Sequence, residues 1–345
     1  MKILIVSTFV PFIDGGGVFI VDWLGDMLRK HGYQTDIIKL PFHSYYPEML
    51  EQMLALKLLD LADFSDLLIT IRTPSYILEH PNKVLWFIHH HRGAYDLWGT
   101  MYQDIPSSPE GLKIKEGIIN ADNVAFKEAK KIYTNSQIVS QRLKKFNNFD
   151  SEVLYPPLME PEKYYCSGYE DYIFYPSRIT HHKRQHLAIQ SMKYTKSSVK
   201  LIIAGKSESM DYLNYLNSII KENNLENKVT IIDQWISQEK KIELFANALA
   251  GMYIPFDEDS YGYVSLESYH AQKSVITCAD SGGTLELIDN CVNGFVVNSL
   301  PESIADVMDK LYYNKTLAKQ MGKAGLDKLL SMNISWENVV QKLVT

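Results

Sequence analysis

The sequence has few cysteines, and none of them are paired at metal-ligand spacing. Only Cys166, Cys278 and Cys291 occur among 345 residues, an odd number without a C-x-x-C motif. This excludes a scaffold built on disulfides and argues against a structural zinc site, because both need cysteines in sets. Unpaired cysteines are typical of a reducing compartment. We therefore expect a cytoplasmic protein.

Long apolar runs and an excess of one charge are also missing. No stretch approaches the roughly 20 apolar residues that span a bilayer, and the apolar first residues lack a signal-peptide cleavage site. The 35 Lys and Arg residues against 41 Asp and Glu residues leave a net charge of -6. Nucleic acid is therefore not an expected partner, because its binders carry basic surfaces. A hydrophobic content of 46% is typical of a globular protein.

Short aliphatic segments alternate with segments of helical periodicity along the chain. In the first half, strands are predicted at 3–7, 34–40, 67–71, 84–88 and 132–135, and helices at 18–30, 48–62, 121–131 and 136–145. In the second half, strands are predicted at 173–176, 200–204, 229–233, 252–255, 275–278 and 294–297. Strands that alternate with helices form parallel α/β sheets, with ligand loops at the carboxyl ends of the strands.

Pro156 and Pro157 interrupt this alternation, which resumes after a tyrosine-rich polar stretch. Two adjacent prolines cannot continue a helix or the interior of a sheet. We therefore predict two doubly wound, Rossmann-like domains, at 1–157 and 158–333, followed by a helix at 334–345.

The segment 253–286 is the most informative part of the chain. An apolar run ends in an acidic turn that contains glycine, and a helical pattern begins near Tyr261. A helix start suits a phosphate, because its backbone N–H groups are unpaired and its dipole is positive. Asp259 and Glu267 lie near this start, and carboxylates accept hydrogen bonds from sugar hydroxyls. The pattern indicates a nucleotide-sugar site.

This segment resembles the donor-site signature of glycosyltransferase family 4, the retaining enzymes of the GT-B fold. The signature has two acids separated by seven residues and then a Gly-Gly pair with a later Glu. Asp259, Glu267, Gly282, Gly283 and Glu286 match it, although Asp259 stands where the family usually has Glu. The resemblance implies GT-B domains that face a central cleft, an acceptor-side domain at 1–157 and a donor domain at 158–333, and a last helix that returns to the first domain.

The resemblance also implies roles for these residues. Asp259 is expected to bind the donor sugar and Glu267 the nucleotide ribose. The backbone amides of the donor-binding stretch are expected to hold donor oxygens; its residues are Tyr261, Gly262, Tyr263 and Val264.

Two cations, Arg178 and Lys183, lie five residues apart after the strand that ends at Pro176. Cations fixed in such a loop can neutralise a diphosphate leaving group. The alternative is a solvated basic loop, which is usual for clustered charges. The spacing matches the family's Arg and Lys pair, so we expect both residues to stabilise the leaving group.

Three further candidates follow strands. Gly15 and Gly16 come after the first strand and lack the G-x-G-x-x-G dinucleotide spacing, but they match the family's Gly-Gly pair near the donor phosphate. His89 matches the family's histidine near the donor sugar, whereas His90 and His91 are best explained as loop histidines. Trp235 is either a contact to the nucleotide base or an ordinary packing aromatic.

No metal or other cofactor is expected. Three consecutive histidines cannot all ligate one ion, because their side chains alternate in direction. The run Asp257-Glu258-Asp259 resembles the metal-binding Asp-x-Asp of GT-A transferases. However, Asp259 is already explained by the donor signature, and the run lies in the wrong half of the chain for that fold.

We therefore expect a retaining transferase that moves a hexose from a UDP- or GDP-sugar to a hydroxyl of a glycan or lipid-linked glycan, as in bacterial surface-polysaccharide synthesis. The alternatives are a sugar-nucleotide epimerase or hydrolase on the same scaffold and a non-catalytic nucleotide-sugar-binding protein. Weak peripheral association with the inner membrane face stays open. Its candidate basic surface comprises Lys127, Lys130, Lys131, Arg142, Lys144 and Lys145.

Overall fold

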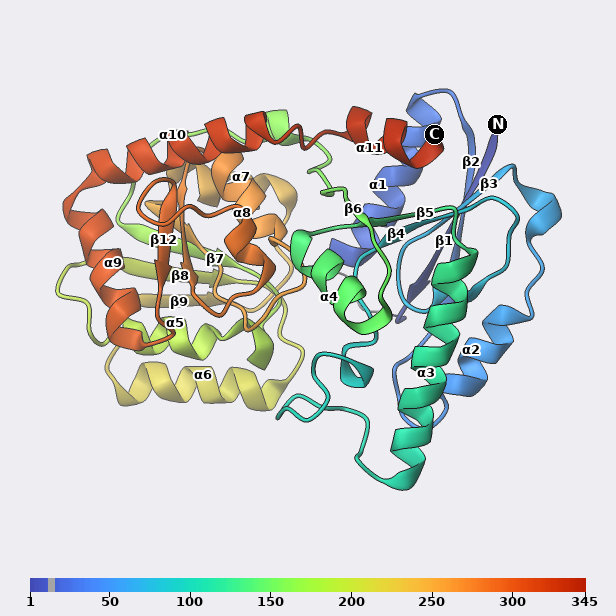
Figure 1. The fold of residues 1–345 in the computed structure, drawn as a ribbon. Helices are drawn as coiled ribbons and strands as arrows, with labels where there is room; N and C mark the ends of the chain where they lie inside the picture. The colour runs from blue at the N-terminus through green and yellow to red at the C-terminus, as the bar shows by residue number, and fades with distance from the viewer. Residues whose placement is uncertain (12–15) are drawn as a thin grey trace. The chain divides into compact units, whose positions relative to one another are not determined.

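The computed structural model describes residues 1–11 and 16–345. The chain divides into two compact units (Figure 1). Unit 1 comprises Met1–Pro157 together with Ile334–Thr345, and unit 2 comprises Leu158–Asn333. Each unit contains one six-stranded sheet.

The sheet of unit 1 is entirely parallel, with strand order β2-β1-β3-β4-β5-β6. Its strands are β1 (Lys2–Phe9), β2 (Gln34–Pro41), β3 (Leu67–Thr70), β4 (Lys83–Phe87), β5 (Lys131–Thr134) and β6 (Glu152–Val153). Its α-helices are α1 (Gly16–Lys30), α2 (Met49–Lys57), α3 (Pro109–Glu128), α4 (Gln137–Asn147) and α11 (Trp336–Val344). β3 and β4 are buried throughout, as expected for strands covered by helices on both faces.

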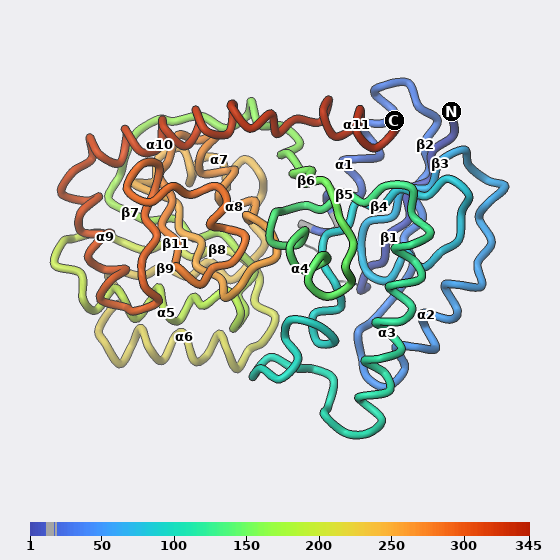
Figure 2. The backbone as a smooth tube through the Cα atoms, viewed as in Figure 1, coloured from blue at the N-terminus to red at the C-terminus, as the bar shows by residue number. Residues whose placement is uncertain are grey.

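The last helix completes one face of unit 1. Four side chains of α11 are buried: Trp336, Val339, Val340 and Leu343. The Trp336 ring meets the Trp86 ring edge to face, with 6.2 Å between centroids, and the Tyr133 hydroxyl donates to the Lys342 carbonyl at 2.9 Å. α11 also packs on α1, as the backbone path shows (Figure 2). Residues 334–345 are therefore part of the core of unit 1.

The sheet of unit 2 is also entirely parallel, with strand order β12-β11-β10-β7-β8-β9. Its strands are β7 (Tyr172–Pro176), β8 (Lys200–Ala204), β9 (Val229–Ile232), β10 (Ala250–Met252), β11 (Ser274–Cys278) and β12 (Gly294–Val297). Its α-helices are α5 (Gln185–Ser191), α6 (Met210–Glu222), α7 (Gln238–Asn247), α8 (Tyr263–His270), α9 (Pro301–Tyr313) and α10 (Lys315–Ser331). Helices cover both faces of the sheet (Figure 1).

The strand order of unit 2 reverses next to its first strand. β7 lies between β8 and β10, so the chain runs outward on one side of β7 and then restarts on the other. In open α/β sheets, ligands bind at the carboxyl ends of the strands beside such a reversal. The loops that follow β7 and β10 are therefore the part of unit 2 best placed for a ligand.

The predicted fold class of two doubly wound parallel sheets is confirmed. Two predicted helices differ from the observed ones by several residues. The helix predicted at 48–62 ends at Lys57, and the helix predicted at 121–131 is the second half of α3, which begins after the capping residue Ser108.

The strand predicted at 252–255 is wrong. β10 ends at Met252, because the chain then leaves the sheet: Ile254 N–H donates to the Tyr175 hydroxyl at 3.4 Å, and Pro255 has no N–H to donate.

Candidate functional site

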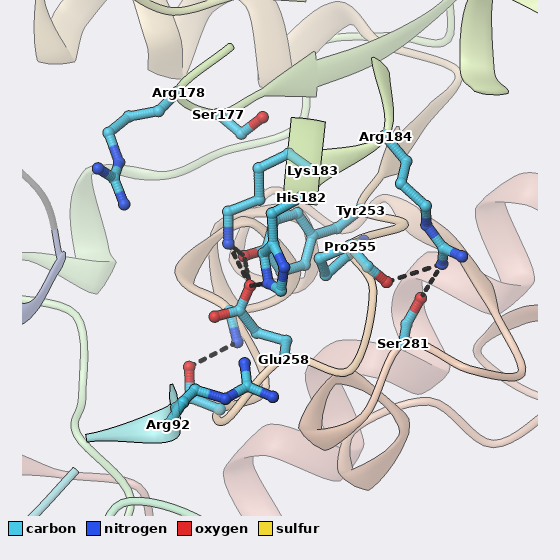
Figure 3. Close-up of polar contacts among 12 residues, drawn as sticks. Arg92, Ser177, Arg178, His182, Lys183, Arg184, Tyr253, Pro255, Glu258 and Ser281 are labelled. Carbon is cyan, nitrogen blue, oxygen red and sulfur yellow. Dashed lines mark hydrogen bonds and ion pairs between the residues drawn. The ribbon is translucent and has the colours of Figure 1, made fainter. Parts of the chain in front are cut away.

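Lys183 lies at the centre of a polar cluster beside the strand reversal of unit 2. It ends a short 3-10 turn, His181–Lys183, in the loop after β7. Its Nζ donates to the Tyr253 hydroxyl at 2.8 Å and also to the Glu258 carboxylate. The Tyr253 hydroxyl donates to the same carboxylate oxygen at 2.9 Å, and His182 Nε2 lies 3.8 Å from it (Figure 3). The loops after β7 and β10 are thus joined through charged side chains.

Glu258 is ionised in this cluster. Burial alone would raise its pKa, but the nearby charges of Lys183 and His182 and the hydrogen bonds from Lys183 and Tyr253 hold the pKa of Glu258 at about 2. The sequence interpretation passed over Glu258 because its neighbour Asp259 matches the donor signature. No pattern in the sequence distinguishes Glu258 from the acids on either side.

Arg184 connects the same loops through hydrogen bonds. It adopts a left-handed backbone conformation with φ 55°. Its guanidinium group donates to the carbonyl oxygens of Ile254 and Pro255, each at 2.8 Å, and to both oxygens of Asp280 at 2.7 and 2.8 Å. Figure 3 shows the contacts of Arg184 with Pro255 and Ser281. Arg184 therefore ties the loop after β7 to the ends of β10 and β11. In the sequence it looks like one more cation in a basic run.

Arg178 does not join the Lys183 cluster. Its side chain is half-exposed, pairs with Glu208, and lies apart from Lys183 (Figure 3). The backbone beneath it is closely packed, because a Cβ added at Gly205 would lie 1.9 Å from the Ser177 carbonyl oxygen. The structure thus places both predicted cations in one loop, but only Lys183 against the acidic turn.

The acidic turn packs on the glycine pair that follows β11. Glu258 and Gly282 form a parallel bridge, and the Gly283 N–H donates to the Glu258 carbonyl at 2.7 Å. Gly282 has φ +61°, and a Cβ there would lie 2.4 Å from the Glu258 carbonyl oxygen. The predicted pair Gly282 and Gly283 therefore allows the turn that carries Asp259 to lie directly on the backbone. Glu286 ends the 3-10 turn that begins at Gly283.

The helix start predicted near Tyr261 lies at Tyr263. Gly262 precedes α8 with φ +71°, and no side chain caps this end of the helix among the described residues. Tyr261 and Val264 are buried, and burial raises the pKa of Tyr263. The side chains at the start of α8 thus pack into unit 2. The first backbone amides of α8 lie at the carboxyl ends of the strands, where ligands bind in such sheets.

Glu267 is held one turn further along α8. It is only 5% exposed. One of its oxygens accepts a hydrogen bond from the Tyr164 hydroxyl at 3.0 Å and forms an ion pair with Lys241 at 2.5 Å. Tyr164 in turn accepts a hydrogen bond from Gln238 at 2.8 Å. These partners lie far from Glu267 in the sequence, which is why its signature position alone did not indicate them.

Trp235 follows β9 and is 58% exposed, so most of its side chain is not buried in the core. Two residues before Trp235, Asp233 accepts hydrogen bonds from the backbone and side chain of Ser207 at 2.7 and 3.1 Å, which connects this loop to the loop after β8.

The remaining candidates belong to unit 1. Gly15 lies outside the described residues, and Gly16 is the first residue of α1. His89 follows β4, its Nδ1 lies 2.7 Å from the His90 carbonyl oxygen, and burial lowers the pKa of His89 to about 4. His90 and His91 are buried, and the His90 ring packs 4.2 Å from the Tyr95 ring between centroids.

Among the described residues, no group of three or more His, Cys, Asp or Glu side chains could hold a metal ion. Over the same residues, every helix is too short or too polar to cross a bilayer. The predicted basic surface includes one error, because Arg142 is buried and lies 3.5 Å from Asp96.

The family model described as Glycosyl transferases group 1 matches residues 162–328, nearly all of unit 2. Unit 2 is therefore similar to the group 1 glycosyl transferases over nearly its whole length. The match covers Arg178, Lys183, Glu258 and the acidic turn, so the cluster beside the strand reversal lies within the part of the chain that matches this family.

Two curated proteins are similar in sequence. The human alpha-1,3/1,6-mannosyltransferase ALG2 is 27% identical over 221 residues, which cover 56% of this chain and 52% of that protein. The mouse protein of the same name is 28% identical over 224 residues, covering 57% of this chain and 53% of that protein. The matches therefore span about half the length of these relatives.

Solved structures resemble the whole chain. HepE from Anabaena in complex with UDP has a TM-score of 0.73 at 16% identity and covers 100% of this chain and 98% of its own. Sucrose-phosphate synthase from Thermosynechococcus elongatus has a TM-score of 0.76 at 16% identity, covering 99% of this chain and 97% of its own. The predicted GT-B fold is confirmed by this likeness and by the two parallel sheets.

Proposed function

We propose that the protein transfers a hexose from a nucleoside diphosphate sugar to an acceptor hydroxyl, with retention of the anomeric configuration. One observation carries the proposal: in a domain similar to the group 1 glycosyl transferases, Lys183 is held by Tyr253 and Glu258 beside the strand reversal, next to the uncapped start of α8. A cation and a helix start at one sheet edge suit a diphosphate.

Lys183 and Arg178 would stabilise the diphosphate as the glycosyl bond breaks. Asp259 would bind the donor sugar, Glu267 the ribose, and Trp235 the base. Gly282, Gly283 and Glu286 would shape the donor loop, and the amides of Tyr261 to Val264 would bind donor oxygens. His89, Gly15 and Gly16 would contribute from unit 1. These roles rest on the resemblance to family 4.

Retention would proceed by front-side attack, in which the departing phosphate helps to deprotonate the acceptor. A metal is not needed in this scheme, since Lys183 supplies positive charge and the Glu258 carboxylate is already bonded to Lys183 and Tyr253. The similar Anabaena protein, solved with UDP and with UDP-glucose, supports a UDP donor. The mannosyltransferases among the relatives support a hexose and leave GDP-sugars as the second donor series.

The acceptor would be a glycan or lipid-linked glycan, as in surface-polysaccharide synthesis by bacteria. Such an acceptor would bring a cytoplasmic enzyme to the inner membrane face, where only weak attachment is proposed. Flotation with anionic liposomes tests this. Recovery of all the protein from the lipid-free fraction would contradict the membrane proposal and would leave the transferase proposal unaffected.

The first test is a thermal-shift panel with UDP, GDP, ADP, CMP and NAD, with and without EDTA. A nucleotide at 100 times its dissociation constant stabilises the folded state by about 2.7 kcal/mol. A shift with UDP or GDP that EDTA leaves unchanged is expected, and it selects the donors for a transfer assay. If neither UDP nor GDP raises the unfolding temperature, the proposed donor site is contradicted.

Products then separate the alternatives. A glycosylated acceptor with retained configuration supports the proposal. Free sugar or an epimer would instead indicate the hydrolase or epimerase. Tight donor binding without turnover on any acceptor would indicate a binding protein, which the Asp259 departure from the family's Glu favours.

Lys183→Met should lower turnover by a factor of about 100 or more, because a group that stabilises charge in the transition state is lost. Lys240→Met is the matched control, since Lys240 is an exposed lysine of the same unit that pairs with Glu243. Steady-state kinetics on both variants checks this. Wild-type turnover in a folded Lys183→Met protein would contradict the assignment.

A further inference from the structure

Lys273 is a buried lysine outside the candidate site. It lies between the end of α8 and the start of β11 and is 0% exposed. Its Nζ lies 3.2 Å from Cys166 Sγ, donates to the Gly168 carbonyl oxygen, and sits 3.9 Å from the centre of the Tyr169 ring. Cys166 is half-buried, so part of the residue is open to solvent.

None of these partners of Lys273 is a carboxylate. Burial lowers the pKa of Lys273 from its usual range. The Lys273 Nζ donates a hydrogen bond to Cys166 Sγ at 3.2 Å, so the nitrogen and the sulfur already lie at contact distance. The pair therefore joins a nucleophilic nitrogen to an oxidisable sulfur, neither of which the transferase mechanism uses.

The backbone on both sides keeps the two side chains facing each other. Before Cys166, the Tyr164 hydroxyl bonds to Glu267 at 3.0 Å, and after it the Tyr169 hydroxyl bonds to the Gln272 carbonyl at 2.9 Å. The segment around Cys166 is thus fastened to α8 and to the turn before β11. Approach of the two atoms requires only movement of the side chains.

We propose that Cys166 and Lys273 form an oxidative modification site, at which hydrogen peroxide creates a covalent bond between Cys166 Sγ and Lys273 Nζ. The thiol passes its proton to the amine, and the thiolate attacks one peroxide oxygen, giving a sulfenic acid and releasing hydroxide, which takes the proton back as water. The amine then attacks the sulfur, and the sulfenic hydroxyl leaves with an amine proton as a second water. The sulfur is oxidised by two electrons and the peroxide is reduced.

Cys291 provides an internal control. It is exposed, and its sulfur lies 3.6 Å from the amide oxygen of Asn290 rather than near an amine. Peroxide should oxidise Cys291 as far as sulfenic acid or beyond, without a link to lysine. The two cysteines thus differ in exposure and in the group that faces the sulfur.

The experiment treats the full-length protein with limiting hydrogen peroxide and identifies its proteolytic peptides by tandem mass spectrometry. The expected product is a linked pair of peptides containing Cys166 and Lys273, lighter than their sum by two hydrogen atoms and separated again by dithiothreitol. Cys166→Ser and Lys273→Met should each abolish the link, whereas Cys291→Ser should leave it unchanged.

A second readout uses stability, because the link would join residues 107 positions apart. A cross-link that closes so long a loop restricts the unfolded chain. Oxidised wild-type protein should therefore unfold at a higher temperature than reduced protein, by several degrees, and Cys166→Ser should not. Sulfinic or sulfonic acid at Cys166 with Lys273 unmodified in wild-type protein would overturn the proposal, whether or not the protein proves to be a transferase.

Discussion

The ion pair of Glu258 and Lys183 contributes to stability as well as to the candidate site. The pKa of a carboxyl group that falls from 4.5 to about 2 on folding stabilises the folded state by about 3 kcal/mol near neutral pH. Because the folded-state pKa is the lower one, this contribution is present above about pH 4.5 and is lost as the pH falls toward about 2. Lys183 is the main source of the effect, so the two residues must be varied together to separate stability from activity.

Glu258→Gln should therefore make the unfolding free energy depend less on pH under acidic conditions. Wild-type protein should lose about 2 kcal/mol of unfolding free energy through this group between pH 7 and pH 3, and the variant should not. Urea unfolding across this range measures the difference. Parallel curves for the two proteins would show that Glu258 is not held as a depressed-pKa carboxylate.

Asp122 should have the opposite pH dependence. It is fully buried in α3 of unit 1, where it accepts hydrogen bonds from Tyr76 at 3.0 Å and Tyr95 at 2.8 Å. Burial raises the pKa of Asp122 to about 7, although both hydrogen bonds act to lower it. Since the unfolded chain ionises near pH 4 and the folded one near pH 7, unfolding free energy should fall as the pH rises through this interval.

Asp122→Asn should remove this decline, because an amide does not titrate. Urea unfolding of unit 1, followed by tryptophan fluorescence between pH 4 and pH 7, measures the slope. An unchanged slope in the variant would place the titration at another residue.

At the scale of elements, the donor loop depends on backbone contact between two turns. Gly282 holds a positive φ with the backbone of Glu258 directly against it. Gly282→Ala should destabilise unit 2 by about 1–3 kcal/mol through strain and displace the acidic turn, so nucleotide affinity should fall as well. Calorimetric titration with UDP and urea unfolding check both effects.

Gly168→Ala is the matched control for Gly282, because a Cβ there meets nothing within 4 Å and no positive φ is required. It should leave both quantities within error of wild type. If both alanine variants have the same stability and the same affinity for UDP, the close contact between Gly282 and the backbone of Glu258 is not needed.

Most elements were predictable from the sequence, because short aliphatic strands and periodic helices have distinct patterns. β8 and β12 have the predicted bounds, since polar residues or glycines bound their aliphatic runs: Lys200 and Gly205 for β8, Gly294 and Asn298 for β12. The first half of α3 was missed although Ser108 and Pro109 form a helix-start signal, because charged residues interrupt its apolar pattern. β10 was misplaced because the apolar run continues through Tyr253 and Ile254, although the Ile254 N–H donates to the Tyr175 hydroxyl and not to a strand.

Within the site, the sequence predicted positions better than partners. Lys183 and Glu267 were found by spacing, but Glu258, Arg184 and Lys241 were not, since pairing across 26 to 96 positions leaves no local pattern. The left-handed backbone conformation of Arg184 also cannot be predicted from the periodicity of the sequence. Side-chain partners therefore required the tertiary structure, whereas the loops that carry them did not.

At the scale of the whole molecule, the chain returns to unit 1 after completing unit 2, so the stability of unit 1 depends on its last residues. α11 supplies Trp336 to the core beside Trp86 and is further fixed by an ion pair between Lys342 and Glu152 at 2.6 Å. Trp336→Ala should destabilise unit 1 by about 3 kcal/mol, as expected for a buried aromatic. Removal of residues 334–345 should cost more, because it also removes Val339, Val340 and Leu343 from the core.

Unit 2 should be unaffected by either change, and the tryptophans allow this to be measured. Of the five tryptophans, only Trp235 belongs to unit 2. In a Trp235→Phe background, all tryptophan fluorescence therefore reports on unit 1, and its unfolding midpoint should fall when Trp336 is replaced. Trp235 itself is a proposed contact to the base, so unit 2 is followed in the otherwise wild-type background by the midpoint shift that UDP induces. If the shift disappears together with the stability of unit 1, the two units do not fold as separate cooperative parts.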